Sequence, residues 1–136
     1  MKSSLSLHIQ TPKDAFLHEE VAHIQLPTEL GVVGILPHHA SMVFSLASGV
    51  IHIFKVNQSL HHYFINPGVA YVVKNTCFIM TEQSKSLKEL DPMVLSEVLE
   101  KYHQTLMGLD VDYERRFIEQ RIKITQAMLR AVKENL

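Results

Sequence analysis

The residues best suited to chemistry are histidines that occur in two adjacent pairs. His38 and His39 close the stretch GVVGILPHHA, and His61 and His62 form a second pair. Neighbouring residues of an extended chain point to opposite faces, so neither pair places two ligands on one ion. A zinc site needs three or four ligands, and the sequence has no cysteine pair and no HExxH motif. The spacing predicts no metal site and favours histidines at turns.

Other catalytic motifs are missing from the sequence as well. The Gly31 to Gly34 stretch does not match the phosphate-binding GxxxxGK[ST] loop. Ser41 follows the histidines, but no GxSxG motif or suitably placed acidic residue indicates a triad. The single cysteine, Cys77, lies in an apolar run, which predicts a buried side chain in a reducing compartment. The residues by themselves indicate no catalytic set.

Composition limits the classes of function. The chain has 136 residues, which fits one domain or one domain with an appendage. A net charge of −1 provides no basic surplus for nucleic acid. No apolar run approaches the ~20 residues of a membrane span, and the N-terminus alternates instead of forming a signal-peptide core. Nine histidines predict a cationic chain in mildly acidic solution, a pH sensitivity that defines no site.

The chain changes from a β pattern to a helical pattern near residue 90. Residues 5–10 alternate apolar and polar side chains, as a half-buried strand does. Further strands are expected at 19–26, 42–46, 50–56, 60–65, 69–74 and 77–81. In the first of these, Ala22, Ile24 and Leu26 are expected to share one face. The last strands are apolar on both faces and are expected to lie centrally or under a partner. The pattern predicts an all-β sandwich or barrel.

Two helices are expected after the strands. Asp91 is a good N-cap, and Pro92 fits the first helical position. Gly108 is expected to end this helix in the left-handed conformation, and Asp110 to cap a second helix that runs to about Asn135. Together they predict an antiparallel hairpin. The second helix carries six basic residues: Arg115, Arg116, Arg121, Lys123, Arg130 and Lys133. They form either a solvated face with i,i+4 pairs or a basic binding surface.

Three stretches together resemble a known family. They are GVVGILPHHASMV, Ser48-Gly49-Val50-Ile51 and Asn66-Pro67-Gly68-Val69, and they resemble the epsilon subunit of the bacterial F-type rotary ATP synthase. That family has a Gly-x-x-Gly-[Ile/Val]-x-Pro-x-His-Ala turn, then a proline-glycine strand entry and a glycine-led strand. Asp110-Val111-Asp112-Tyr113 is similar to the start of the family's last helix. Order, spacing and length agree over nearly the whole chain.

The resemblance implies a mainly β plus α chain with two parts. A ten-stranded β sandwich would occupy residues 1–88 and dock on the stalk and the c-ring, and a regulatory two-helix hairpin would occupy residues 89–136. The implied function is that of a non-catalytic rotor subunit on the central stalk of the proton-translocating synthase. Such a subunit couples rotation to ATP synthesis, and its C-terminal helices inhibit ATP hydrolysis when they extend. A sodium-translocating form of the enzyme is a close variant.

The resemblance also implies partners and a location. The partners would be the gamma subunit, the c-ring and, when the hairpin extends, the alpha and beta subunits. No cofactor and no nucleic acid are implied. The subunit would be peripheral to the membrane through its complex, on the cytoplasmic face of the bacterial inner membrane.

Two contact surfaces follow from the resemblance. The c-ring-facing loop would be Glu29, Leu30, Gly31 and Val32, shaped by the glycines of residues 31–34. The gamma-subunit contact would be Pro37, His39, Ser41 and Phe44. His39 matches the family histidine, whereas Ser41 replaces a common proline. Only Glu29 is charged in the first loop, so a more apolar ring contact is expected.

The helical part carries two further expectations. The six basic residues of the last helix are those able to meet an acidic segment of the beta subunit. Leu90 and Asp91 begin a nucleotide-binding motif, [Ile/Leu]-Asp-x-x-Arg-Ala, but Val94 stands where the arginine belongs. The loss of that charge-assisted donor predicts no tight ATP binding.

Two functions of other classes stay open at this point. A cupin-like metal-binding β domain would use the histidines, and metal analysis of the protein would detect it. A free-standing adaptor would use the basic helix to bind an acidic partner outside any synthase.

Overall fold

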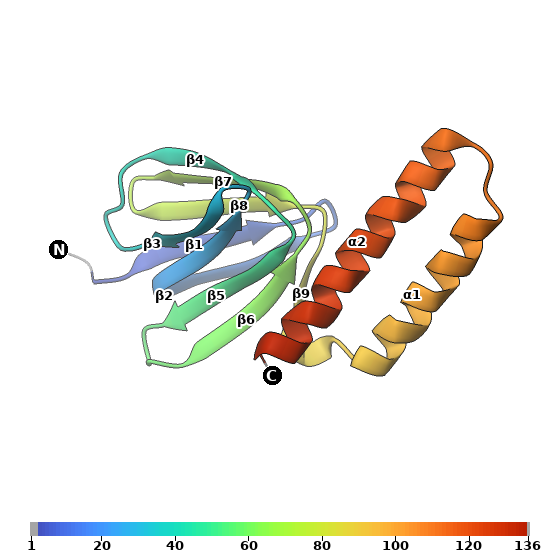
Figure 1. Cartoon of the computed structure of the whole chain (residues 1–136). Coiled ribbons are helices and arrows are strands. Elements are labelled where there is room, and N and C mark those ends of the chain that lie inside the picture. The colour runs from blue at the N-terminus through green and yellow to red at the C-terminus, as the bar shows by residue number, and fades with distance from the viewer. Residues whose placement is uncertain (1–2, 136) are drawn as a thin grey trace. The chain divides into compact units, whose positions relative to one another are not determined.

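The computed structural model of the chain describes residues 3–135, which form two compact units that divide between Ser86 and Leu87. Strands fill the first unit, and the helices α1 and α2 belong to the second (Figure 1). Within the described residues, no helix has the length and apolar content that a membrane crossing needs.

The first unit contains nine strands over the described residues. They are β1 (Leu5–Gln10), β2 (Ala15–Thr28), β3 (Gly31–Ile35), β4 (Met42–Leu46), β5 (Gly49–Lys55), β6 (Leu60–Ile65), β7 (Gly68–Val73), β8 (Thr76–Thr81) and β9 (Ser84–Ser86). Hydrogen bonds join them in the order β1-β8-β7-β4-β2-β5-β6-β9, with β3 on β2. The β1–β8 pair is parallel and the other pairs are antiparallel.

Strand β2 joins the two layers of this sandwich. Its first half pairs with β1, and its second half pairs with β3 and β5. Between Val21 and His23 the β5 register advances by one residue, so Ala22 is the extra residue of a β-bulge. The expected face Ala22, Ile24, Leu26 is therefore wrong at its first member, because the bulge puts Val21 in the core and leaves Ala22 half-buried. One bulged strand serves both layers, and residues 3–135 contain nine strands where the resemblance implied ten.

The core of the sandwich consists of alternate residues from both layers. Leu7 and Ile9 of β1 and Ile79 of β8 face Ile24 of β2 and Ile53 of β5, all with at most 1% of their surface exposed. Cys77 lies in the same cluster, as its apolar surroundings predicted. Burial raises the pKa of its thiol to about 12, so it is an unreactive core residue.

The second unit is the helical hairpin. A 3-10 turn at Leu87–Glu89 precedes α1 (Pro92–Met107) and α2 (Asp112–Asn135). Asp91 caps α1 as expected, since its carboxylate accepts a hydrogen bond from the Met93 N–H at 2.9 Å. The buried residues of α2 lie in its second half, from Ile122 to Val132.

Three local expectations about turns are wrong. Gly108 ends α1 with φ −97°, not in the left-handed conformation. Asp110 is not the cap of α2, because the first i,i+4 bond runs from the Arg115 N–H to the Val111 carbonyl. Gly34 lies inside β3 opposite Gln25 and shapes no loop. Gly31, with φ +123°, is the glycine whose backbone conformation a side chain would strain.

Candidate functional site

A row of rings and apolar side chains crosses the outer face of five strands of the sandwich. Cross-strand pairing places Val43 of β4 opposite Tyr71 of β7, Tyr71 opposite Phe78 of β8, Phe78 opposite His8 of β1, and His8 opposite His18 of β2. The Tyr71 and Phe78 rings are stacked with centroids 4.8 Å apart, and the Phe78 and His8 rings with centroids 4.9 Å apart. The row is a continuous surface built on paired strands.

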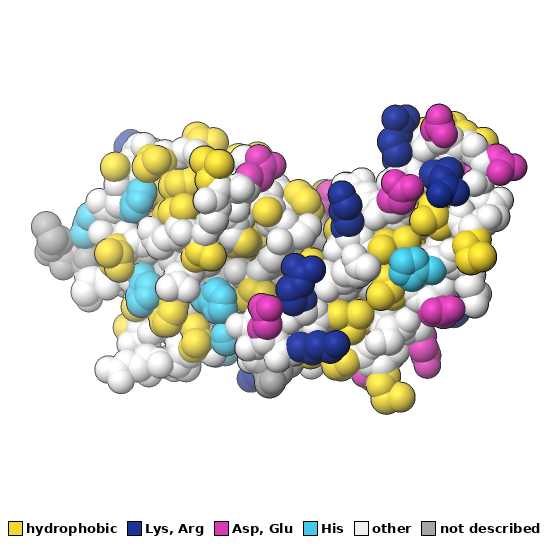
Figure 2. Space-filling model, in the orientation of Figure 1, with side chains coloured by type: hydrophobic (Ala, Val, Ile, Leu, Met, Phe, Trp, Pro, Cys, Tyr) yellow, Lys and Arg dark blue, Asp and Glu magenta, His cyan; other side chains and the backbone are white. Residues whose placement is uncertain are grey.

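A second apolar row lies beside the first. Val69 of β7 pairs with Met80 of β8, and both are exposed, as is Val43 at 73%. We call the two rows together the aromatic face: His8, His18, Val43, Val69, Tyr71, Phe78 and Met80. In Figure 2, hydrophobic and histidine side chains are interspersed over the strands, whereas Lys and Arg gather over the helices. An exposed apolar surface of this kind is typical of a protein interaction site.

No sequence motif indicates the aromatic face, although one signal for it is present in the chain. Residues 69–74 and 77–81 are apolar on both faces, which predicted that they lie centrally or under a partner. In the structure Ala70, Val72 and Ile79 fill the core while Tyr71 and Phe78 face outward. The alignment of the outward residues across five strands depends on the topology, which the spacing along the chain does not reveal.

Of the residues expected to contact the gamma subunit, three (Pro37, His39 and Ser41) lie between β3 and β4, and Phe44 lies in β4. The His39 ring approaches the Phe44 ring edge-on at 6.2 Å, and its Nδ1 lies 2.7 Å from the Ala40 carbonyl oxygen. Ser41 is exposed and Pro37 is half-buried. Phe44 packs partly against the core, and its neighbour Val43 is the outward residue of β4.

Asn75 holds this segment beside the aromatic face. The His38 N–H donates to Asn75 Oδ1 at 2.8 Å, and Asn75 Nδ2 donates to the Ser4 carbonyl at 2.9 Å. The Ser6 N–H donates to the Asn75 carbonyl at 3.1 Å. The segment is thus joined to the start of β1 and to the β7–β8 turn, which border the row of rings.

The expected ring-facing residues are Gly31 and Val32 at the start of β3 and Glu29 and Leu30, which form the tight turn before it. Leu30 at its tip is fully exposed, and Val32 is 71% exposed. The Thr28 hydroxyl orders the turn, because it donates to the Gly31 carbonyl at 2.6 Å and accepts from the Leu30 N–H at 3.2 Å. A fixed backbone therefore presents an apolar tip beside the Glu29 carboxylate.

The six basic residues of α2 separate into two groups. Arg116, Lys123 and Arg130 are exposed and recur every seventh residue, which places them on one side of the helix, and Lys133 is exposed one turn beyond. We call these four residues the basic stripe. A row of cations at this spacing fits an extended acidic surface.

The other two cations are engaged inside the hairpin. Arg115 Nη1 donates to the Leu106 carbonyl at 2.9 Å and to the Leu109 carbonyl at 3.0 Å, so it satisfies carbonyl groups where α1 ends. The Arg121 guanidinium lies over the Phe117 ring, 5.2 Å from its centroid. Both side chains are half-buried and serve the hairpin itself.

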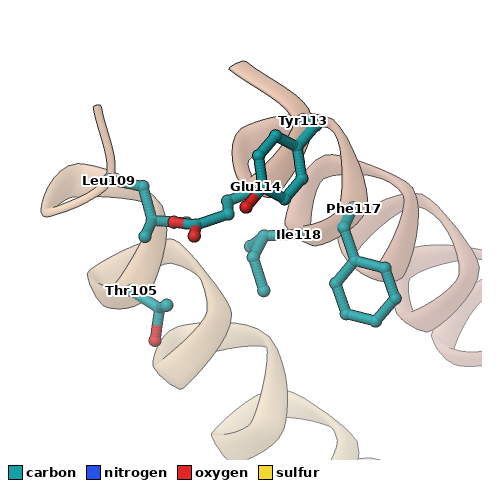
Figure 3. A pocket seen from close by; sticks show the side chains of 6 residues that line it. All are labelled: Thr105, Leu109, Tyr113, Glu114, Phe117 and Ile118. Atoms are coloured by element: carbon teal, nitrogen blue, oxygen red, sulfur yellow. The ribbon is translucent and has the colours of Figure 1, made fainter. Parts of the chain in front are cut away.

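A pocket of about 510 Å³ lies at the end of the hairpin where the helices are joined. Its lining is Thr105, Leu109, Tyr113, Glu114, Phe117 and Ile118 (Figure 3). The walls are mostly apolar, and Tyr113 and Phe117 are more than half exposed. Such a pocket suits an apolar side chain of a partner better than a small polar ligand.

The start of α1 holds the two residues of the expected nucleotide motif. Asp91 uses its carboxylate as the helix cap, and Leu90 is buried at 8% exposure. Val94 is 52% exposed and brings no charged donor to this point. The geometry assigns Asp91 a structural role in the helix start.

The histidines do not assemble into a metal site in the part of the chain that the structure describes. Among residues 3–135, no group of three or more His, Cys, Asp or Glu side chains could hold an ion. Histidines of different strands meet in pairs instead: His8 with His18, and His52 with His62 at a centroid distance of 4.8 Å. Burial, with repulsion from His52 and His61, lowers the pKa of His62, and burial lowers that of His52.

Comparison with known proteins decides the family. The family model described as "ATP synthase, Delta/Epsilon chain, beta-sandwich domain" matches residues 4–86, which is the strand unit. The chain belongs to the ATP synthase delta/epsilon family. The resemblance recognised in the sequence is confirmed, and so is the fold class of a β sandwich followed by two helices.

Named relatives align with most of the chain. The ATP synthase epsilon chain of Rhodospirillum centenum is 28% identical over 134 residues, which are 95% of this chain and 92% of the relative. The ATP synthase epsilon chain of Nitratidesulfovibrio vulgaris is 33% identical over 91 residues, 67% of each protein. The delta/epsilon likeness therefore includes the hairpin as well as the sandwich.

Solved structures of ATP synthases contain similar chains. A chain of the Euglena gracilis mitochondrial ATP synthase, solved as OSCP/F1/c-ring in rotational state 1, matches with a TM-score of 0.83 and 25% identity over 97% of this chain and 83% of that one. A chain of the Tetrahymena thermophila mitochondrial ATP synthase central stalk and c-ring matches with a TM-score of 0.62 at 15% identity. The second likeness shows that the fold is shared.

Proposed function

We propose that this chain is a non-catalytic rotor subunit of the central stalk of an F-type ATP synthase. Family membership and the match to a chain of an F1/c-ring assembly support this role. As a subunit of the synthase the chain transmits rotation between the membrane ring and the catalytic head and thereby couples ion flow to ATP synthesis. Its complex is membrane-associated, and we infer that the chain lies on the cytoplasmic face of the bacterial inner membrane.

The gamma subunit docks on the aromatic face and on the neighbouring segment from Pro37 to Ser41. The observation that supports this contact is the row of rings and apolar side chains over five strands, because its apolar area is open to solvent and paired strands hold it in place. Burial of such a surface contributes about 25 cal/mol for each Å² removed from water. The contact joins the sandwich, residues 1–88, to the stalk.

A direct test is binding of the full chain to the purified gamma subunit of the same synthase. Val43→Asp puts a charge into the aromatic face and is expected to weaken binding at least tenfold. Val56→Asp is the matched control, because Val56 is also exposed, at 61%, but lies outside that face. Equal binding by both variants would contradict docking on the aromatic face.

The turn between β2 and β3 contacts the c-ring. Leu30 and Val32 present exposed apolar side chains on a backbone ordered by Thr28, and Glu29 adds one carboxylate. Leu30→Asp is expected to reduce co-purification of the c-ring with the stalk while binding to isolated gamma is retained. Loss of gamma binding in the same variant would mean that Leu30 belongs to the interface with the gamma subunit.

The hairpin, residues 89–136, is the regulatory part. In an extended state the basic stripe meets an acidic surface of the beta subunit, obstructs rotation and suppresses ATP hydrolysis. The support is the stripe's exposure and seven-residue spacing, whereas Arg115 and Arg121 are occupied within the hairpin. Two packed helices can exchange between states that differ by a few kcal/mol, so partners can shift the balance.

The assembled synthase tests this regulatory role. Removal of the residues after Asp91 is expected to raise ATP hydrolysis, and so is reversal of Arg116, Lys123 and Arg130 to Glu. Lys101→Glu is the control, because Lys101 is an exposed cation on α1 outside the stripe. Unchanged hydrolysis after truncation would show that the hairpin does not inhibit. An effect of Lys101→Glu equal to that of the stripe reversal would mean a general charge effect.

The chain does not act as a tight ATP sensor. Asp91 is committed to capping α1, and Val94 lacks the donor that the family motif places there. Titration calorimetry of the protein with Mg-ATP is expected to show no binding in the micromolar range, and micromolar affinity would contradict this.

A further inference from the structure

The aromatic face ends in two histidines stacked directly on each other. His8 of β1 and His18 of β2 are cross-strand neighbours, and their ring centroids are 3.8 Å apart with 24° between the planes. His8 is at the same time stacked on Phe78, which continues the row to Tyr71. Both imidazoles thus belong to the surface proposed to meet a partner, and they are its ionisable edge.

The groups that border the stack on the described strands are mostly uncharged, and one of them is a carboxylate. On the same face, β8 supplies Phe78 and Met80, β7 supplies the phenol of Tyr71 beyond them, and β1 supplies the neutral Ser6 and Gln10. The nearby carboxylate is Glu20 of β2, two residues from His18, and it accepts a hydrogen bond from the Ser4 hydroxyl at 2.9 Å.

The two imidazoles are compatible with the stack only when at least one is neutral. Two cations at 3.8 Å would repel each other, whereas two neutral rings gain from contact. Burial and the repulsion from His18 lower the pKa of His8 from its ordinary value of 6.5, in agreement with the geometry. Mildly acidic solution is therefore where the surface changes its charge.

We propose that the His8–His18 stack makes docking of the aromatic face pH-dependent, so that the partner is bound while the imidazoles are neutral and released as they take up protons. This inference rests on the aromatic face being the docking surface of the proposed rotor subunit. A partner that covers the stack removes it from water, and a buried imidazolium is costly unless a carboxylate pairs with it. Binding and proton uptake consequently compete.

Linkage gives the size of the effect. If docking requires one imidazole to lose its proton, the dissociation constant rises by up to about tenfold for each pH unit below the pKa of that group in the free chain. If both imidazoles must be neutral, the rise is steeper. The loss of affinity is expected to begin below about pH 6.5 and to be absent above neutrality.

The experiment measures the affinity of the full chain for the purified gamma subunit of the same synthase from about pH 7.5 to about pH 5. The wild type is expected to lose at least about tenfold in affinity over this range. The variant His8→Phe with His18→Phe retains stacked rings without ionisable nitrogen and is expected to change less than about threefold. The matched control, His52→Phe with His62→Phe, replaces the other cross-strand pair, on β5 and β6, and is expected to keep the wild-type pH dependence.

The outcomes separate the two hypotheses. A wild type with no loss of affinity at low pH, or a His8/His18 variant with the full loss, overturns the inference on pH. If Val43→Asp leaves binding at pH 7.5 unchanged, the docking surface itself is wrong. Circular dichroism of each protein at the lowest pH shows whether the sandwich is still folded. If the double variant does not fold, His8→Gln alone is expected to reduce the pH dependence of gamma binding. The pH titration of wild-type binding still tests the inference in that case.

Discussion

Replacement of Arg115 by Ala is expected to loosen the joint of the hairpin. The Arg115 guanidinium donates to the Leu106 and Leu109 carbonyls, at 2.9 and 3.0 Å, where α1 ends and leaves its last carbonyls without helical partners. Each hydrogen bond from a charged donor contributes about 1.5–3 kcal/mol when buried. Arg115 is half-exposed, so hydrogen bonds to water replace part of this contribution. We expect the substitution to lower the stability of the joint by about 1–2 kcal/mol.

Hydrogen exchange measures this loss locally. The Gly108 and Leu109 amides donate to the Thr105 and Leu106 carbonyls at the same joint and are the natural reporters. A loss of about 1–2 kcal/mol corresponds to exchange about 5 to 30 times faster in Arg115→Ala. Arg115→Lys is expected to exchange at a rate between those of the wild type and Arg115→Ala, because a single ammonium does not span both carbonyls as well.

Arg116→Ala is the matched control for this reasoning. This variant removes an arginine side chain one residue later, from an exposed position on the basic stripe. The exchange rates of the Gly108 and Leu109 amides are expected to change less than about twofold. If Arg115→Ala leaves the reporters unchanged, or if both variants have the same effect, the two hydrogen bonds do not hold the joint.

Further predictions concern the sandwich. Gly68→Ala is expected to lower the free energy of unfolding by about 3 kcal/mol or more, because its Cβ would overlap a backbone carbonyl of β8, whereas Gly34→Ala, with open space around its Cβ, is expected to change it by less than about 1 kcal/mol in urea denaturation. Burial lowers the pKa of His52 and His62 below the unfolded value of 6.5. The unfolded chain then binds more protons, so the free energy of unfolding is expected to fall as the pH drops below about 6.5, and less steeply when both are replaced by Gln. A thiol reagent at pH 8 is expected to leave Cys77 unmodified until the chain unfolds, since its pKa is raised to about 12, and rapid modification of the folded chain would contradict its burial.

Much of the fold follows from local patterns. The alternation in residues 5–10 predicted β1, and the boundary between strands and helices near residue 90 agrees with the start of α1 at Pro92. These succeed because period-two burial, a proline at the first helical turn and an Asp cap act over a few residues. The expected inward position of Ala22 and the expected left-handed conformation of Gly108 were wrong. The conformations of a bulge and of a helix end depend on the residues that pack around them. Arg115, seven residues after Gly108, is one of those neighbours.

The sequence by itself determined which family this protein belongs to, because the turn motif and the glycine-led strands depend on chain order alone. It also determined that Asp91 starts a helix and that the last helix is basic. Only the tertiary structure decided which cations remain available to a partner, since hydrogen bonding and burial separate Arg115 from Arg116. It also decided where the aromatic face lies. Residues 8, 18, 43, 71 and 78 are scattered along the chain, and they meet because β1, β8, β7 and β4 are neighbours in the sheet and β2 pairs with β1.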